Sequence, residues 1–346
     1  MRTLRTIAAL AAVAALAGCG EKAEPGSGAS GSRDDFRLVL DYFPNADHAG
    51  LYAAQATGAY ARAGLNVKIQ APPDPSAPLK LLRAGRADLV VSYEPELLLA
   101  RDKGATDLVA VGALVQKPLT SLIALPGSHV AGVKDLAGKR VGTAGISYQD
   151  AYLKTILAKA GVDPGSVKET GVGFDLIRPL ITGRVDATLG AFWNYEGVDL
   201  QRRGKNPRIL RMDQLGVPTY AELVFVARKQ DLDENGASKL RRFLQATAQG
   251  QKALERNPAV GVDALLKASN GLDRGLQTAA VKATLPVFFP AGSQHSFGWQ
   301  DPNAWDAYGR WMQQNKLVTR PPDAARALTN EFLPGEGLAP GPAGGG

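Results

Sequence analysis

Short apolar runs alternate with stretches of helical periodicity from Phe36 onwards. Strands are predicted at residues 36–42, 66–71 and 88–92, and helices at 49–61 and 77–84. Strict alternation favours a mainly parallel sheet, because each helix carries the chain back to begin the next strand in the same direction. The first part of the chain is therefore predicted to be an α/β domain.

The same order of elements returns about 100 residues later. The second set is predicted as strands at 140–144, 166–171 and 186–190, with helices at 148–160 and 176–182. Residues 85–88 (GRAD) match 183–186 (GRVD) at a spacing of 98, and residues 61–65 match 158–162 at a spacing of 97. Two matches in one register indicate two similar lobes that face each other.

Three further strands connect and complete the lobes, at residues 107–114, 121–125 and 221–227. The first crossing between the lobes is predicted near Pro126, and the strand at 221–227 brings the chain back. Helices are then predicted at 238–256, 258–269, 272–288 and 302–315, which we expect to finish the first lobe. Trp305, Tyr308 and Met312 fall at helical spacing and are predicted to be core residues. The predicted first lobe is 36–125 plus 221–333, the second lobe is 126–220, and the two crossings form a hinge.

The amino-terminal segment is predicted to be a removable leader. Residues 1–18 have a basic start followed by an apolar run too short to span a bilayer. Residues 16–19 (LAGC) resemble the cleavage box of bacterial lipoproteins, which implies that Cys19 becomes a lipidated N-terminus. The alternative is an ordinary signal peptide with an incidental cysteine. Residues 19–35 are predicted to be a flexible tether and 334–346 a disordered tail.

Charge and cysteine content exclude several classes of function. The 346 residues carry 40 Lys plus Arg against 33 Asp plus Glu, and the basic residues are scattered, so nucleic acid is not an expected partner. Cys19 is the one cysteine in the sequence, which excludes intrachain disulfides and thiolate metal sites. His48, His129 and His295 are isolated, and no nucleophile or nucleotide-binding motif is complete. We therefore expect no metal, no cofactor and no catalytic residues.

Aromatic and hydrogen-bonding side chains instead gather after the predicted strands, where open α/β sheets bind ligands. Their rings could stack on a flat molecule while acids and amides orient its nitrogens, which suits a small planar heterocycle. Taken singly, each aromatic is more often a packing residue. The candidate ligand-binding residues are Asp41, Tyr42, Phe43, Asn45, His48, Ser92, Tyr93, Glu94, Trp193, Asn194, Tyr195, Glu196, Tyr220 and Glu222, with Ser147 and Tyr148 nearby.

Two stretches carry a resemblance to a known family. Residues 41–52 (DYFPNADHAGLY) and 216–224 (GVPTYAELV) resemble motifs of type II periplasmic solute-binding proteins, in the branch that binds pyrimidine precursors of thiamine. The resemblance covers residues 36–333, and Tyr42 stands where this branch commonly has Trp. It implies a monomeric lipoprotein of the cell envelope that delivers its ligand to an ABC permease and its ATPase. Phe43, Trp193 and Tyr195 would then stack on the ligand, and Asp41, Asn45, Glu94 and Glu196 would hydrogen-bond to it.

Other functions remain open within the same superfamily. Related proteins bind riboflavin or other heterocycles, and a binding protein can also serve a signalling partner. A related enzyme builds the pyrimidine from its own cofactor, using a lysine after the third strand and a cysteine-rich run before the return crossing. The corresponding places here read Ser92 and residues 217–221 (VPTYA), so this chemistry is not expected.

Overall fold

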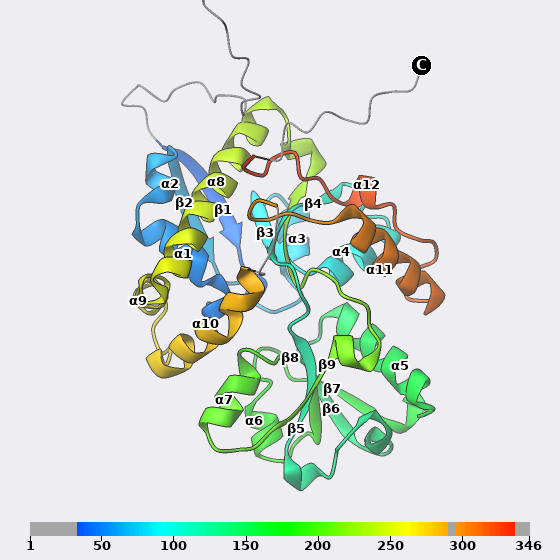
Figure 1. Cartoon of the computed structure of the whole chain (residues 1–346). Coiled ribbons are helices and arrows are strands. Elements are labelled where there is room, and N and C mark those ends of the chain that lie inside the picture. Colours follow the sequence, from blue (N-terminus) through cyan, green and yellow to red (C-terminus); the bar gives the residue numbers. More distant parts are fainter. Residues whose placement is uncertain (1–32, 290–294, 336–346) are drawn as a thin grey trace, which may run out of the picture.

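Two lobes, each built around a five-stranded sheet, make up the computed structural model, which describes residues 33–289 and 295–335 (Figure 1). The strand order is β2-β1-β3-β10-β4 in the first sheet and β7-β6-β8-β5-β9 in the second. The predicted two-lobed α/β architecture is confirmed. The predicted leader, Cys19, and most of the tether and tail lie outside the described residues. Across the described ranges, none of the helices has the length and apolar character needed to span a membrane.

The first lobe begins with alternating strands and helices. These are β1 (Asp34–Val39), α1 (Ala49–Ala56), α2 (Ala59–Arg62), β2 (Leu65–Gln70), α3 (Pro78–Arg83), β3 (Leu89–Ser92), α4 (Glu94–Asp102) and β4 (Leu108–Val115), with the short 3-10 helix η1 (Ala46–His48) before α1. The predicted single helix at 49–61 is wrong, because Gly58 adopts a left-handed φ of 73° and separates α1 from α2.

The second lobe is one continuous segment. It contains β5 (Thr120–Ala124), β6 (Arg140–Thr143), α5 (Ser147–Ala160), β7 (Lys168–Gly171), α6 (Arg178–Ile181), β8 (Ala187–Phe192), α7 (Glu196–Arg202) and β9 (Arg208–Arg211). The sequence patterns do not predict α4, α7 or β9. Two of these begin directly at a polar candidate residue, Glu94 for α4 and Glu196 for α7.

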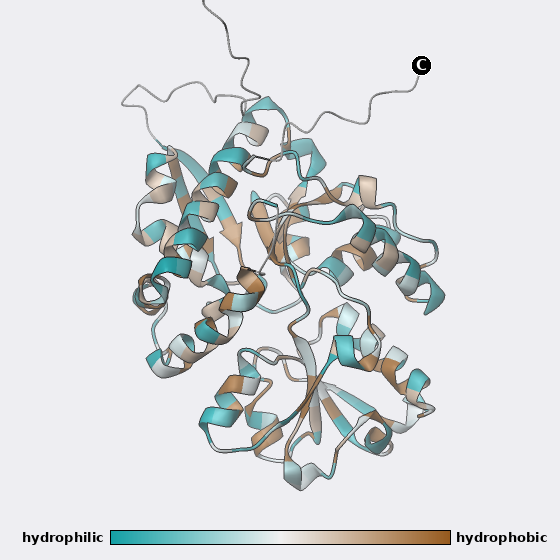
Figure 2. Cartoon of the chain, in the orientation of Figure 1, coloured by the Kyte–Doolittle hydropathy of each residue, from teal (hydrophilic) through white to brown (hydrophobic). Residues whose placement is uncertain are grey.

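The chain then returns to complete the first lobe. The returning elements are β10 (Leu223–Arg228), α8 (Glu234–Arg256), α9 (Pro258–Ala268), α10 (Arg274–Phe288), α11 (Pro302–Gln314) and α12 (Ala324–Ala327). Trp305, Tyr308 and Met312 of α11 are buried, as predicted. Figure 2 shows hydrophobic colours on the central strands of this lobe and hydrophilic colours along the exposed side of α8.

The first crossing between the lobes lies earlier than predicted. β5 pairs with β8 and β9 of the second sheet, so the chain leaves the first lobe between Val115 and Thr120, before β5. The predicted crossing near Pro126 placed this strand in the wrong lobe, because its apolar pattern suits either sheet. The sheets are also mixed rather than mainly parallel: β10 runs antiparallel to β3 and β4, and β5 runs antiparallel to β8 and β9.

The internal duplication appears in three dimensions at the two Gly-Arg-x-Asp turns. Asp88 accepts hydrogen bonds from the backbone N–H of Arg37 at 2.7 Å and from its guanidinium at 2.7 and 3.2 Å. Asp186 accepts the corresponding bonds from Arg140, at 2.8 Å from the backbone and 2.8 and 3.0 Å from the guanidinium. The first turn therefore pins the start of β3 to the neighbouring strand β1, and the second pins the start of β8 to the start of β6.

Candidate functional site

The loop between β1 and α1 supplies much of the first lobe's side of the cleft. Asn45 has an extended backbone and caps η1, because its Oδ1 accepts the N–H of Asp47 at 2.9 Å. The backbone N–H of Asn45 in turn donates to Nδ1 of His48 at 3.2 Å. The loop is therefore held rigidly by its own side chains.

Asp41 is fixed at this wall by two donors. Nε2 of His48 lies 2.9 Å from one carboxylate oxygen, and the hydroxyl of Tyr93 donates to the other at 2.8 Å. Because Nδ1 of His48 already accepts a hydrogen bond, the network assigns the neutral tautomer with its proton on Nε2. Asp41 is 1% exposed and presents a buried acceptor to the cleft.

A small cavity lies between the lobes and is lined from both sides. Its volume is about 20 Å³, room for roughly one water molecule. The lobes are therefore closed on each other. The lining residues are Asp41, Tyr42, Asn45 and Tyr93 from the first lobe, and Ile146, Gln149, Leu176, Gly190, Phe192, Tyr195 and Glu196 from the second.

Aromatic rings fill the space around this cavity. The ring centroid of Tyr42 lies 4.8 Å from that of Phe174, and its hydroxyl donates to the Phe174 carbonyl at 2.5 Å. Phe43 meets Tyr195 with centroids 5.9 Å apart. Rings from both lobes thus converge on one gap, an arrangement that can hold a flat apolar ligand face.

Glu196 and Glu94 are buried glutamates near the cleft, but only Glu196 faces it. Glu196 lines the cavity and accepts the backbone N–H of Phe192 at 2.7 Å, and burial raises its pKa to about 8. Glu94 begins α4 outside the cavity lining and accepts the N–H of Ala221 at 2.7 Å. Burial raises the pKa of Glu94 to about 8 as well, and its Oε1 has no hydrogen-bond partner. Glu196 is thus a group that can accept a hydrogen bond from a ligand as a carboxylate or donate one as an acid.

Other candidate residues connect the lobes. Nδ2 of Asn194 donates to Asp47 at 2.6 Å and to Thr284 of α10 at 2.7 Å. The Tyr195 hydroxyl accepts a hydrogen bond from Nε2 of Gln277, also on α10, at 3.0 Å. On the far side of the cleft, Glu96 accepts the Ser147 hydroxyl at 3.0 Å. Most of these contacts join one lobe to the other.

Glu222 organises the hinge. Its carboxylate accepts the backbone N–H groups of Leu119 at 2.6 Å and Thr120 at 2.8 Å, the Thr120 hydroxyl at 2.8 Å and the Tyr220 hydroxyl at 3.0 Å. Leu119 and Tyr220 belong to the outgoing and returning connections, so this one side chain ties the two together. Burial raises the pKa of Glu222 to about 7, although its donors oppose that shift.

The structure sorts the predicted site residues into two groups. One group lines the cavity: Asp41, Tyr42, Asn45, Tyr93, Tyr195 and Glu196. The other lies outside its lining: Phe43, His48, Ser92, Glu94, Trp193, Asn194, Tyr220 and Glu222. Trp193 lies under the guanidinium of Arg211 at 4.7 Å and donates to the carbonyl of Pro118 in the hinge at 3.2 Å. Which residues contact a ligand stays a prediction.

Gln149 and Gly190 line the second lobe's side of the cavity and were not among the predicted site residues. Oε1 of Gln149 accepts the backbone N–H of Ala144 at 2.8 Å. A Cβ atom on Gly190 would lie 2.2 Å from Nε2 of Gln149, and Gly190 has a φ of +103°. The available signal for Gly190 was its position as a glycine in a predicted strand, just before the candidate residues that follow that strand.

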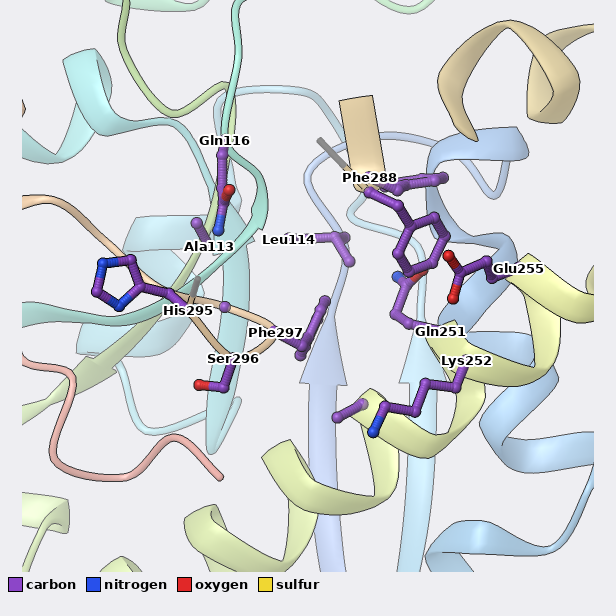
Figure 3. A pocket seen from close by; sticks show the side chains of 13 residues that line it. Ala113, Leu114, Gln116, Gln251, Lys252, Glu255, Phe288, His295, Ser296 and Phe297 are labelled. Atoms are coloured by element: carbon purple, nitrogen blue, oxygen red, sulfur yellow. The ribbon is translucent and has the colours of Figure 1, made fainter. Parts of the chain in front are cut away.

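A larger cavity of about 190 Å³ lies within the first lobe, between β4, α8 and the end of α10 (Figure 3). Phe288 and Phe297 form apolar walls, and Lys252 and Glu255 extend from α8. All of these residues belong to one lobe, so a ligand there would gain no contacts from closure. We therefore assign the candidate site to the interlobe cleft. Among the described residues, no group of three or more His, Cys, Asp or Glu could hold a metal ion.

Comparisons with other sequences agree with this two-lobed architecture. A family model described as NMT1/THI5 like matches residues 45–260. The chain is 33% identical to a putative thiamine biosynthesis protein of Haemophilus influenzae, covering 84% of this chain and 90% of that protein. It is 30% identical to the formylaminopyrimidine-binding protein of Halalkalibacterium halodurans (85% and 89% covered). It is 27% identical to the 4-amino-5-hydroxymethyl-2-methylpyrimidine phosphate synthase of Legionella pneumophila (86% and 92% covered).

Solved structures of lower identity share the fold. The alkanesulfonate-binding protein SsuA from Xanthomonas axonopodis pv. citri superposes with a TM-score of 0.64 at 19% identity, covering 87% of this chain and 99% of that one. A Candida albicans protein described as having the generic periplasmic binding protein fold gives a TM-score of 0.62 at 14% identity, covering 86% and 96%. At these identities the likeness shows the periplasmic-binding-protein fold alone.

Proposed function

The chain belongs to the NMT1/THI5-like family, and we propose that within this family it captures a pyrimidine precursor of thiamine and delivers it to an ABC importer. The precursor would be of the hydroxymethylpyrimidine or formylaminopyrimidine type. The relative named for binding formylaminopyrimidine is 30% identical over 85% of this chain, which supports this ligand class.

The observation that carries the proposal is the composition of the interlobe cleft. Tyr42 and Tyr195 offer ring faces from opposite lobes, and Asp41 and Glu196 offer carboxyl groups beside them. An aminopyrimidine has a flat ring and an edge of alternating donors and acceptors, so both kinds of side chain have a matching surface on it. Closure would bring the second lobe's rings and acid onto a ligand already resting on the first lobe.

Binding, rather than synthesis, is favoured by the residues at the third strand. Relatives named as pyrimidine phosphate synthases are 22% to 27% identical to this chain. The lysine that such an enzyme would use after the third strand is Ser92 here, which is 2% exposed and pairs with Val224 across β3 and β10. Without an amine at this place there is no group to form a Schiff base. The protein would therefore bind its ligand unchanged.

The amino-terminal segment supports a location at the membrane surface. Cys19 would carry the lipid and residues after it would tether the binding lobes to the membrane surface, where a permease and its ATPase receive the ligand. Mass spectrometry of the mature protein checks this directly: a diacylglyceryl modification on Cys19, absent from Cys19→Ser, is expected. An unmodified mature chain would remove the anchor from the proposal.

Calorimetric titration tests the ligand. Hydroxymethylpyrimidine, formylaminopyrimidine, thiamine and riboflavin are titrated separately into the purified protein, and we expect the two small pyrimidines to bind more tightly than either larger compound. Tight binding of riboflavin alone would favour the alternative heterocycle, and no binding of any of the four would refute the ligand class.

A further inference from the structure

Asp47 and Asn194 form a buried polar pair across the two lobes. Asp47 lies in η1 of the first lobe and Asn194 follows β8 of the second, and their exposures are 1% and 0%. Nδ2 of Asn194 donates one hydrogen to Asp47 Oδ1 at 2.6 Å and the other to the Thr284 hydroxyl at 2.7 Å. Both amide hydrogens are therefore used.

Two oxygen atoms of this pair are left over. Oδ2 of Asp47 and Oδ1 of Asn194 are buried and have no hydrogen-bond partner. Both are acceptors when the carboxyl is ionised, so neither can satisfy the other. Leaving two such atoms buried without a donor is costly, and an ionised carboxylate without a cation partner costs more.

One proton shared between the two oxygens would give each of them a partner. A carboxylic acid and a primary amide can join through two hydrogen bonds, one N–H to O and one O–H to O. The first bond is already present between Asn194 and Asp47. We propose that the closed protein binds a proton on Oδ2 of Asp47, that this proton is donated to Oδ1 of Asn194, and that closing of the lobes therefore takes up a proton.

The surroundings of Asp47 favour the neutral acid. Burial is the largest influence and raises its pKa to about 6. Asp41 adds negative charge nearby, whereas Glu196, whose own pKa is raised to about 8, and the Tyr195 ring are neutral near pH 6. His48 opposes the shift when it is charged, but its Nδ1 accepts a hydrogen bond, which assigns it as neutral. The charged side chains of α9 and α10 are exposed: Asp263, Lys267, Arg274 and Lys282.

Opening of the lobes removes Asn194 and returns Asp47 towards water. Its pKa then falls towards the ordinary aspartate value of about 4, so the open form releases the proton. The closed form therefore becomes more stable relative to the open form as pH falls through about 6. This stabilisation is complete near the pKa of Asp47 in the open form. One proton changes the closing equilibrium by up to about tenfold per pH unit within that window. The inference rests on the two-lobed fold and the closed contacts, and it is independent of which ligand is bound.

Infrared spectroscopy locates the proton. Difference spectra of the ligand-free protein between pH 7.5 and pH 5 are compared for the wild type and Asp47→Asn, whose amide supplies the missing donor without a proton. We expect a protonated-carboxyl C=O band that appears near pH 6 in the wild type and is missing in Asp47→Asn. Identical difference spectra for the two proteins would overturn the proton assignment.

Small-angle X-ray scattering tests the coupling to closure. The radius of gyration of the ligand-free wild type should fall as pH is lowered through about 6, and Asp47→Asn should lack that step. Thr284→Val is the control: it removes the hydroxyl that accepts from Asn194 and lies 3.3 Å from Oδ1 of Asp47, but it keeps the Asp47 carboxyl and should retain the step. A step that persists in Asp47→Asn, or a wild-type radius that does not change with pH, would overturn the coupling, whatever the titrations with pyrimidines show.

Discussion

Phe43 and Tyr195 meet edge to face across the cleft, with ring centroids 5.9 Å apart and planes inclined by 62°. Phe43 lies in the loop after β1 and Tyr195 directly precedes α7, so the contact joins the two lobes. A flat ligand that inserts between these two rings must move them apart. The aromatic contact thus marks where the closed protein would have to open.

Tyr195→Ala is expected to weaken binding of the pyrimidine ligand by about 1 to 3 kcal/mol, because a ring face in the cavity is lost. Tyr195→Phe keeps the ring and should retain most of the affinity. Trp193→Phe is the matched control, since Trp193 lies outside the cavity lining. Calorimetry on the three variants checks this, and a larger loss for Trp193→Phe than for Tyr195→Ala would contradict the site.

Glu94 should make the protein less stable as pH rises. Its pKa is raised by burial to about 8, so the folded form holds a proton that the unfolded form releases above the ordinary glutamate value. Stability is therefore lost between roughly pH 4.5 and pH 8, by up to about 1.4 kcal/mol per pH unit. Urea unfolding at several pH values should show a shallower decline for Glu94→Gln. Glu255→Gln, at an exposed position of α8, is the control; equal slopes for Glu94→Gln and wild type would refute the assignment.

Glu222→Ala should destabilise the fold strongly. The change leaves the N–H groups of Leu119 and Thr120 and two hydroxyls without their acceptor inside the hinge. A cost of about 2 to 4 kcal/mol is expected for buried donors left unpaired. Asp35→Ala, which removes an exposed partner of Lys68, should have little effect. Chemical unfolding measures both, and similar midpoints for the two variants would show that the hinge does not depend on this carboxylate.

Gly190→Ala combines backbone strain with steric overlap. The new Cβ would lie 2.2 Å from Nε2 of Gln149, and a φ of +103° is unfavourable for alanine. We expect a loss of roughly 1 to 3 kcal/mol in stability and weaker ligand binding. Gly145→Ala is the control, because Gly145 has a φ of +83° but a Cβ added there would have no atom within 4 Å. It therefore measures the cost of backbone strain without steric overlap. Adding Gln149→Ala to Gly190→Ala should restore part of the stability; no restoration would mean that overlap is unimportant.

Short sequence patterns are sufficient to predict much of this fold. The two Gly-Arg-x-Asp turns were recognisable because the pattern recurs at a spacing of 98. In the structure each glycine has a left-handed φ, 70° at Gly85 and 68° at Gly183, and each aspartate binds a neighbouring strand. Placement of residues after strands likewise brought Asp41, Tyr93 and Glu196 to one cavity. These features depend on short stretches of chain.

Contacts between residues far apart in the sequence could not be predicted in the same way. The strand Thr120–Ala124 is apolar throughout, and only its pairing with β8 and β9, far along the chain, decides which sheet it joins. The candidate residue Asn194 donates hydrogen bonds to Asp47 and Thr284, which lie 147 and 90 residues away in the sequence. Glu94 and Glu196 are the first residues of α4 and α7. Both were interpreted as polar loop residues after a strand, so the helices that they begin were not predicted.

The order of strands in the first sheet has a consequence for biogenesis. β4 lies at the sheet edge and pairs with β10 alone among the strands, and all eight of its residues are buried in the finished protein. β10 is made only after the whole second lobe. A chain emerging amino-terminus first must therefore keep an apolar, unpaired strand from aggregating while some hundred residues follow. Chaperone protection of the growing chain is most needed at this point.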